Sequence, residues 1–151
     1  MRRLVKRLVV ALLMVVLTLA VVGYLAFRGS LPTLHGTLTV SELHAPVDID
    51  RDAYGVPTVR GSSRESVAFG TGFAHAQDRY FQMDLLRRQA AGELSALVGP
   101  AALPLDRRHR WHRFRKRVGE MLRNIPERHR SILTAYSAGV NAGLASLRVR
   151  P

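Results

Sequence analysis

The sequence predicts an α+β protein in which an amino-terminal transmembrane helix precedes a β-hairpin and three to four further helices. Three patterns support this fold class. An uncharged apolar run extends from Leu8 to Phe27, apolar and polar residues alternate between Val47 and Val59, and apolar residues then recur every three or four positions. Because the chain has only 151 residues, the part after the apolar run forms at most one small domain or a piece of a larger one.

The apolar run LVVALLMVVLTLAVVGYLAF is long enough to cross a membrane. At about 1.5 Å per residue it spans the roughly 30 Å hydrocarbon core of a bilayer. Four basic residues precede it and only Arg28 follows closely, while Tyr24 stands where an outer-interface aromatic would lie. Residues 1–28 are therefore expected to form a single-pass anchor, with the amino terminus in the cytoplasm and the remainder in the periplasm or outside the cell.

A cleaved signal peptide is the main alternative for this segment, and a buried helix of a soluble protein is a third. Signal peptides have a shorter apolar region of about 7–15 residues and a small-x-small cleavage site. The exit sequence GYLAFRGSLP offers no convincing site of that kind, so the pattern favours an uncleaved anchor. Residues 29–45, with glycine, proline and alternating threonines, are expected to form an extended tether.

The elements after the tether follow from local signals. VDIDRDAYGVPTVRG alternates on both sides of a turn at Asp52 to Gly55, which is typical of a β-hairpin. Ser62 and Ser63 are suited to cap a helix that begins near Arg64, as one long helix or two consecutive ones. Its apolar stripe comprises Phe69, Phe73, Ala76, Tyr80 and Met83. Gly70 and Gly72 permit close approach or a break, and the segment is expected to end at Gly99 and Pro100.

Two more helices are expected in the last third of the chain. One should begin after Asp106, and another after Pro126, whose fixed φ suits a first helical position. The expected apolar face of the last helix comprises Ile132, Leu133, Tyr136, Val140, Leu144 and Leu147.

Three stretches together resemble a known family. IDRDAYGVPTVRG, then FGTGFAHAQDRYFQMDLLRRQAAGELSALVG, then LTAYSAGVNAGL are similar to the start of the α-chain region in penicillin acylase family precursors, which are N-terminal nucleophile amidohydrolases. The resemblance covers roughly residues 45–147, and residues 46–151 are assigned to this region. The motif residues that carry it are His75, Gln77, Asp78, Arg79, Gln82, Arg87 and Arg88.

The resemblance implies a large αββα protein that cleaves itself into two chains and exposes a serine at the start of the second. That serine would attack the amide carbonyl with its own α-amino group as the base. The cleavage junction, the serine and the pocket residues would follow Pro151, so the chain is expected to be an incomplete part of that fold and inactive alone. No catalytic, cofactor or metal residue is assigned here, and the calcium site found in many members would have its ligands later.

The polar residues of the second stretch have two interpretations. His75, Asp78 and Arg79 can be imagined as an acid/base group, but polar residues between apolar helix positions more often fix packing, which is the favoured interpretation. Asp84 is expected to pair with Arg87 and Arg88 at the surface, because helical residues three and four apart are neighbours.

The net charge of +12 is concentrated in the first thirty residues and in residues 106–130, where ten basic residues face three acidic ones. His109 and His112, with His129 further on, are poor metal candidates because the surrounding arginines repel cations. Trp111 and Phe114 between the arginines are suited to stack on nucleic-acid bases, but the segment lies outside the cytoplasm if the anchor forms. A solvated face or contact with the missing acidic part of the protein is therefore favoured, and contact with anionic lipid headgroups is the other alternative. Cysteine is absent, which excludes disulfides and thiol chemistry.

The leading hypothesis is the amino-terminal part of a membrane-anchored acylase that hydrolyses an N-acyl amide, such as a β-lactam side chain or an acyl-homoserine lactone. Its partners would be the membrane, the remainder of the precursor and, in the complete enzyme, a small N-acyl substrate, with no nucleic acid. The alternative is a non-catalytic, membrane-tethered module that binds through the basic helix 107–123. Residues 30–151 are expected to fold poorly in isolation, because a two-stranded hairpin and an apolar helix stripe need partners.

Overall fold

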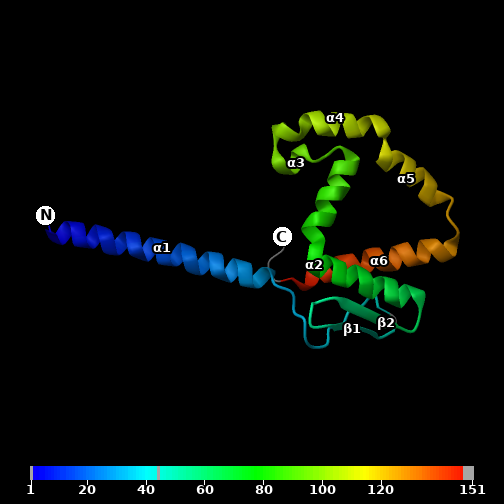
Figure 1. The fold of residues 1–151 in the computed structure, drawn as a ribbon, viewed down its shortest axis with the longest axis horizontal. Helices are drawn as coiled ribbons and strands as arrows, with labels where there is room; N and C mark the ends of the chain where they lie inside the picture. Colours follow the sequence, from blue (N-terminus) through cyan, green and yellow to red (C-terminus); the bar gives the residue numbers. More distant parts are fainter. Residues whose placement is uncertain (1, 44, 148–151) are drawn as a thin grey trace.

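The computed structural model describes residues 2–43 and 45–147. Its first helix, α1 (Arg2–Ser30), projects away from an assembly of shorter helices and one hairpin (Figure 1). No residue of α1 is buried, and the helix is long and apolar enough to cross a membrane. The run from Leu8 to Phe27 lies wholly within it. Neither helix nor strand occupies the described part of residues 31–46, which leads into the hairpin.

The expected β-hairpin is present. Strands β1 (Val47–Arg51) and β2 (Pro57–Gly61) pair antiparallel, with Ile49 opposite Val59. In the turn, the side-chain oxygen Oδ1 of Asp52 accepts the backbone N–H groups of Tyr54 and Val56, each at 2.9 Å. The turn residues therefore fix the register that turns the apolar side chains of both strands to one face.

Helix α2 (Arg64–Ala91) begins where the sequence indicates, because the Oγ of Ser63 accepts the N–H of Ser66 at 3.0 Å. Arg79 has non-helical angles, φ −150° and ψ 28°, and divides α2 into two arms. We call residues 64–78 the inner arm and residues 80–91 the outer arm. Both readings of this segment are thus met in part, since one run of helix bends into two straight pieces (Figure 1).

The expected end of this segment at Gly99 is wrong for α2. The helix ends at Gly92, which adopts a left-handed conformation with φ 70°, and its N–H donates to the carbonyl of Gln89. Gly99 instead ends the one-turn helix α3 (Ser95–Val98), with φ 85°. Both glycines adopt the positive φ that commonly ends a helix, and Gly92 comes first of the two.

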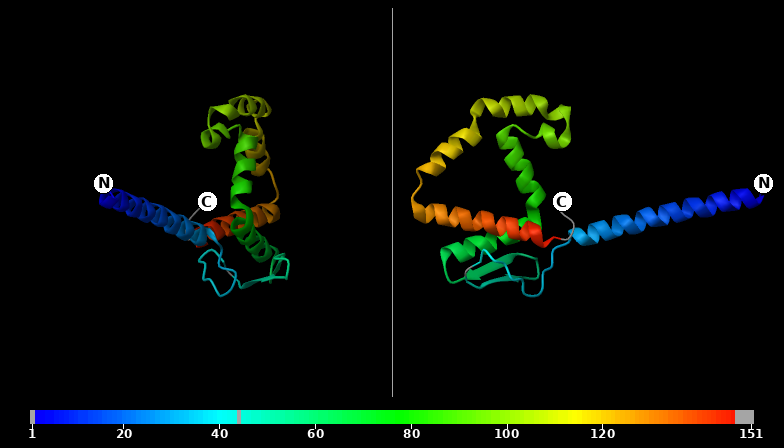
Figure 2. Two further views of the ribbon diagram at one scale, coloured as in Figure 1. Left: turned by 60° about the vertical axis from the view of Figure 1, so that its left-hand side comes forward. Right: turned by 180° about the vertical axis from the view of Figure 1, so that it is seen from behind.

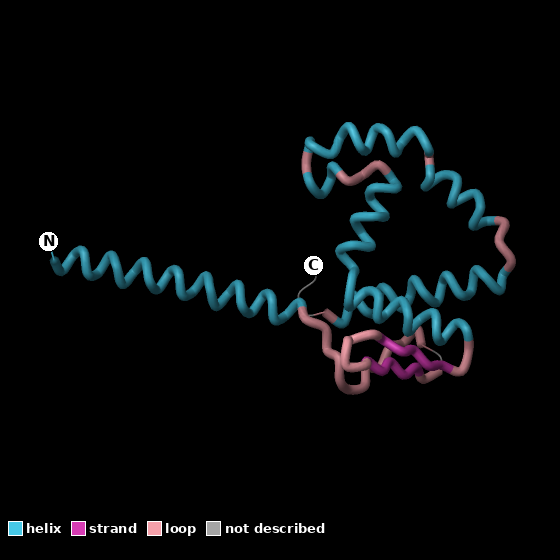
Figure 3. Tube along the Cα trace, viewed as in Figure 1, coloured by secondary structure: helices cyan, strands magenta, loops and turns pink. Residues whose placement is uncertain are grey.

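The third expected helix also differs from the prediction. A short 3₁₀ turn, η1 (Pro100–Ala102), leads into α4 (Leu103–His112), which begins before Asp106 because Pro104 suits a first turn. Arg113, with φ 52°, then separates α4 from α5 (Phe114–Arg123). These elements arch from the outer arm to the last helix (Figure 3).

The last helix, α6 (Glu127–Ser146), begins directly after Pro126, as predicted. It crosses the inner arm at very short range (Figure 2). A Cβ atom added to Gly139 would lie 2.0 Å from the Phe69 carbonyl oxygen, and one added to Gly72 would lie 2.2 Å from that of Tyr136. The glycines therefore let the two backbones touch. Leu133 departs from the expected apolar face, because it is 47% exposed.

The buried apolar residues of the described chain are few: Phe69, Ala74, Ala76, Ala102 and Leu147. Most belong to the crossing of the inner arm and α6, and the hairpin covers the inner arm from the other side, with Val47 and Val59 against Gly70. The α+β character of the chain is confirmed. The complete αββα arrangement remains an expectation, since residues 2–43 and 45–147 hold one two-stranded sheet.

Candidate functional site

The motif residues His75 and Asp78 lie on the inner arm and contact different elements. The Nδ1 atom of His75 lies 3.0 Å from the hydroxyl oxygen of Tyr136 on α6, with the two rings edge to face. Asp78 accepts two hydrogen bonds from the Arg51 guanidinium of β1, both at 2.9 Å. Among the described side chains no hydrogen bond joins His75 to Asp78, so the imagined acid/base pair is not assembled.

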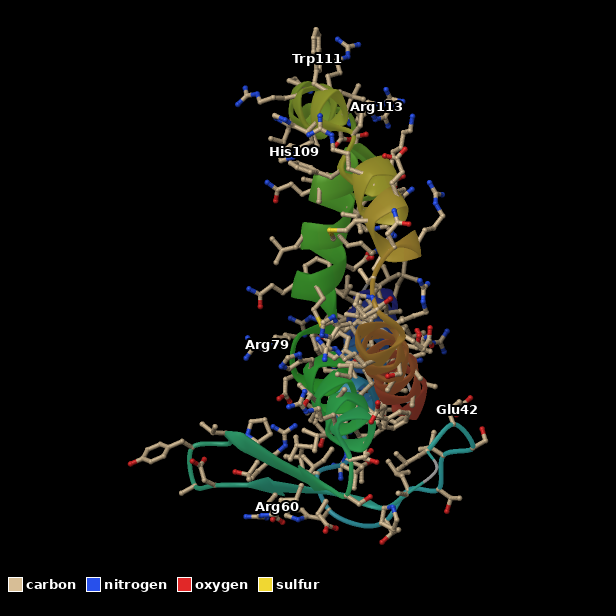
Figure 4. All side chains as sticks on the ribbon, turned by 90° about the vertical axis from the view of Figure 1, so that its right-hand side faces the viewer. Glu42, Arg60, Arg79, His109, Trp111 and Arg113 are labelled. Carbon is tan, nitrogen blue, oxygen red and sulfur yellow. The ribbon has the colours of Figure 1, made fainter. Side chains whose placement is uncertain are left out.

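The Arg51–Asp78 pair ties the end of the hairpin to the last turn of the inner arm. Their side chains are 14% and 27% exposed, and Arg51 also donates to the carbonyl of Gly55 in the hairpin turn at 3.1 Å. A planar guanidinium that binds a carboxylate through two donors fixes orientation as well as distance. The Arg51–Asp78 pair therefore holds the hairpin at a set angle to α2. It lies one residue before the bend at Arg79, the residue that Figure 4 labels on α2.

The remaining motif residues divide between a linker contact and an ion-pair group. Gln77 reaches the Thr33 carbonyl at 3.5 Å, and Gln82 is exposed. Asp84 binds Arg87 and Arg88, as the spacing predicts, at 2.6 Å to each. Hydrogen bonds from Arg88 and then Arg87 hold the pKa of Asp84 below its usual value. Asp84 is only 15% exposed, so the group is less superficial than expected.

Sequence reasoning missed a polar cluster around Asp106. This residue is 2% exposed, and its carboxylate accepts the backbone N–H groups of Leu94 at 2.9 Å and Ser95 at 2.8 Å. Burial raises the pKa of Asp106, but hydrogen bonds from Ser95 and Leu94 outweigh it, so the pKa lies below the usual value. Asp106 thus caps α3 from another helix.

Two arginines of the basic run, defined as residues 106–130, complete this cluster. The Nε of Arg110 donates to the carbonyl of Gly92 at 2.8 Å, and Arg115 forms a two-point ion pair with Glu93 at 2.5 and 2.9 Å. Both contacts fix the GELS turn after α2 against α4 and α5. The available sequence signal was an aspartate after the apolar residues LPL, before the arginine run.

The histidines of the basic run do not gather. His112 stacks on Phe114 with ring centroids 5.2 Å apart, whereas the Nδ1 of His109 is buried without a hydrogen-bond partner among the described residues. Figure 4 shows Trp111 pointing outward from α4, and it is 85% exposed. Across residues 2–43 and 45–147 no three His, Asp or Glu side chains come together as a metal site.

Two hollows of about 500 and 510 Å³ lie beneath the segment of residues 33–43. They share Leu38, Val40 and Phe73, and the first is bordered by β1 and the inner arm. No described serine hydroxyl hydrogen-bonds to a histidine; those of Ser63 and Ser131, for example, bond to Ser66 and Glu65. The described residues therefore form supporting contacts rather than an activated nucleophile.

Comparison with known proteins gives a consistent result. A family model described as penicillin amidase matches residues 46–151. The chain is 38% identical over 121 residues to penicillin acylase 2 proenzyme from a Pseudomonas species, covering 80% of this chain and 16% of that protein. It is 35% identical over 122 residues to acyl-homoserine lactone acylase QuiP from Pseudomonas aeruginosa, covering 81% and 14%.

The structural comparison agrees with the sequence relatives. The chain matches a thermostable penicillin G acylase from Alcaligenes faecalis with a TM-score of 0.64 and 35% identity, over 71% of this chain and 57% of that one. The chain spans only 16% and 14% of the length of the two curated relatives. The matched region begins at the hairpin, so α1 lies outside the family match.

Proposed function

We propose that this chain, which belongs to the penicillin amidase family, supplies the amino-terminal part of an acylase that hydrolyses the amide bond of N-acyl compounds. The observation that carries this proposal is the match to a solved penicillin G acylase, at 35% identity and a TM-score of 0.64. The named relatives act on penicillins and acyl-homoserine lactones. Both substrates carry an acyl group on an amine nitrogen, which defines the proposed substrate class.

The described residues are proposed to hold the hairpin, α2 and α6 in place relative to one another. Arg51 and Asp78 hold the hairpin on the inner arm, while His75 and Tyr136 join that arm to α6. The serine nucleophile and its oxyanion hole would come from the remainder of the precursor, since the match covers only 16% and 14% of the two curated relatives. The chain alone is then expected to show no amidase activity.

A chimera tests this assignment. Residues 46–151 would replace the matching segment of the Pseudomonas penicillin acylase 2 proenzyme, and the product would be assayed for hydrolysis of a chromogenic N-acyl anilide. The proposal predicts two processed chains and measurable hydrolysis. The matched control carries the corresponding segment of the Pseudomonas aeruginosa relative. An active control beside an unprocessed, inactive chimera of this chain would contradict the proposal.

Helix α1 is proposed to be an uncleaved anchor that places the remainder of the chain outside the cytoplasm. Its length and composition support this, and Arg28 donates to the Tyr24 hydroxyl at 3.0 Å, as suits two residues at an interface. A reporter that is active only after export, fused after Pro151, should be active and remain with the membranes. Recovery of the fusion in the cytoplasm would contradict export, and release as a soluble exported protein would favour a cleaved signal.

The second candidate function is a non-catalytic, membrane-tethered module that binds through the basic helix 107–123. The exposed Arg107, Arg108 and Arg113 favour it, because none of the three forms an ion pair in the described chain. The chimera separates the two candidates, since a binding module has no reason to restore a processed acylase.

A further inference from the structure

The turn between α2 and α4 forms an apolar corner, defined here as residues 94–105, with the sequence LSALVGPAALPL. It contains no charged residue. Every exposed residue in it is apolar: Ala96, Leu97, Val98, Pro100, Ala101, Leu103 and Pro104. Leu97, Val98 and Leu103 are 44%, 55% and 42% exposed. Exposed apolar residues gathered in one turn indicate an interaction site rather than a solvated turn.

The position of the apolar corner points to one partner. In Figures 1 and 2, α3 lies level with the carboxyl-terminal end of α1 when distance is followed along the direction of α1. The hairpin and α5 lie farther along that direction, away from α1. If α1 crosses a bilayer, the apolar corner therefore reaches the plane at which α1 leaves it.

The backbone of the apolar corner suits a medium of low polarity. Asp106 accepts the N–H groups of Leu94 and Ser95. The N–H groups of Val98 and Gly99 donate within the corner, to the carbonyls of Leu94 and Ser95. Unsatisfied backbone groups are costly in lipid, and these four donors enter it already paired.

The residues that follow the apolar corner have the charge that a lipid headgroup requires. Arg107 and Arg108 are exposed on α4, one to two turns after Leu103, and neither forms an ion pair with a described carboxylate. Apolar residues beside arginines are typical of segments that lie in a membrane interface, where arginine binds phosphate. We propose that the apolar corner inserts into the outer leaflet of the membrane that α1 crosses, with Arg107 and Arg108 against anionic headgroups.

This inference rests on the anchor role proposed for α1, and the experiment separates the two. Because the chain has no cysteine, Val98→Cys provides one site for a nitroxide label in the full-length protein. The protein would be reconstituted in vesicles of phosphatidylcholine and phosphatidylglycerol. Collisions of the label with oxygen, which enters lipid, and with a nickel chelate, which stays in water, report its depth. Two matched labels serve as references: Val16→Cys in the middle of α1, and Met121→Cys on α5. Met121 is 59% exposed.

The label at residue 98 should collide with oxygen and be shielded from nickel, as at residue 16, whereas residue 121 should show the reverse. Replacing Arg107 and Arg108 with glutamate should move residue 98 toward water without moving residue 16. If the label at residue 16 lies in lipid and the label at residue 98 lies in water, the inference is overturned and the anchor role of α1 is retained. Shielding of residue 98 from both reagents shows a protein partner and also overturns it. Residue 16 in water overturns the anchor and the inference together.

Discussion

The two arms of α2 are equally helical but are held in different ways. The inner arm meets α6 backbone to backbone, and its Phe69 and Ala76 are 4% and 1% exposed. The outer arm makes little contact with α5, and its Phe81 and Leu86 are 55% and 59% exposed. Large apolar residues occur in both arms. Small residues that allow close approach, rather than the number of large ones, decide which crossing is packed.

Polar contacts take over where packing is absent. Asp106, Arg110 and the Glu93–Arg115 pair fix the turn after the outer arm, while apolar side chains nearby remain exposed. The inner region therefore depends on shape, and the outer region depends on capping and charge. The two regions should respond to different substitutions.

The largest effect is expected from Gly139→Ala. The new Cβ would lie 2.0 Å from the Phe69 carbonyl oxygen, so the inner arm and α6 must separate. Overpacking of this kind costs about 1–3 kcal/mol or more of unfolding free energy, which denaturant titration would measure. The control is Gly119→Ala on α5, where nothing lies within 4 Å of the new atom. It should be neutral or stabilise by about 0.5–1 kcal/mol, and equal loss in both variants would contradict the proposed crossing.

Asp106→Asn should loosen the outer region and leave the inner one intact. Because the pKa of Asp106 is lowered from 3.8 in the folded chain, its carboxylate stabilises the fold above that pH. That contribution is lost as pH falls through the lowered pKa. The difference in melting temperature between wild type and variant should therefore be full at neutral pH and shrink in acid. A difference that stays constant into strong acid would show that the charge of Asp106 is not what matters.

A smaller effect is expected from Arg51→Ala, which removes the tie between the hairpin and α2. The side chains of Arg51 and Asp78 are mostly shielded, so the loss should be about 1–3 kcal/mol of unfolding free energy. Arg60→Ala is the control, because its pair with Asp50 is 63% and 66% exposed. Such pairs contribute about 0–1 kcal/mol. Two equal losses would mean that the Arg51 pair is no more than a surface contact.

Local signals predicted much of the inner region. The turn at Asp52, the cap at Ser63 and the start after Pro126 each depend on residues near in sequence, and the structure has all three. Gly70 and Gly72 permit either close approach or a break, and the structure shows close approach at both.

The outer region was harder to predict because its decisive features are not local. Arg79 and Arg113 adopt backbone angles that their residue type does not demand. Asp106 is buried and accepts N–H groups from residues eleven and twelve positions earlier, although it stands beside a run of arginines. The order and length of the three stretches indicate the family, whereas the separate contacts of His75 and Asp78 are visible only in the structure.

Hydrogen exchange on the full-length chain tests the difference between the two regions most directly. The sequence alone predicts that residues 30–151 fold poorly in isolation, whereas the structure buries the crossing of the inner arm and α6. Amides of residues 64–78 and of α6 should therefore exchange slowly in the full-length chain. Amides of α5 should exchange at rates close to those of an unfolded chain, because none of its residues is buried. Equal and strong protection of α5 and the inner arm would contradict the account.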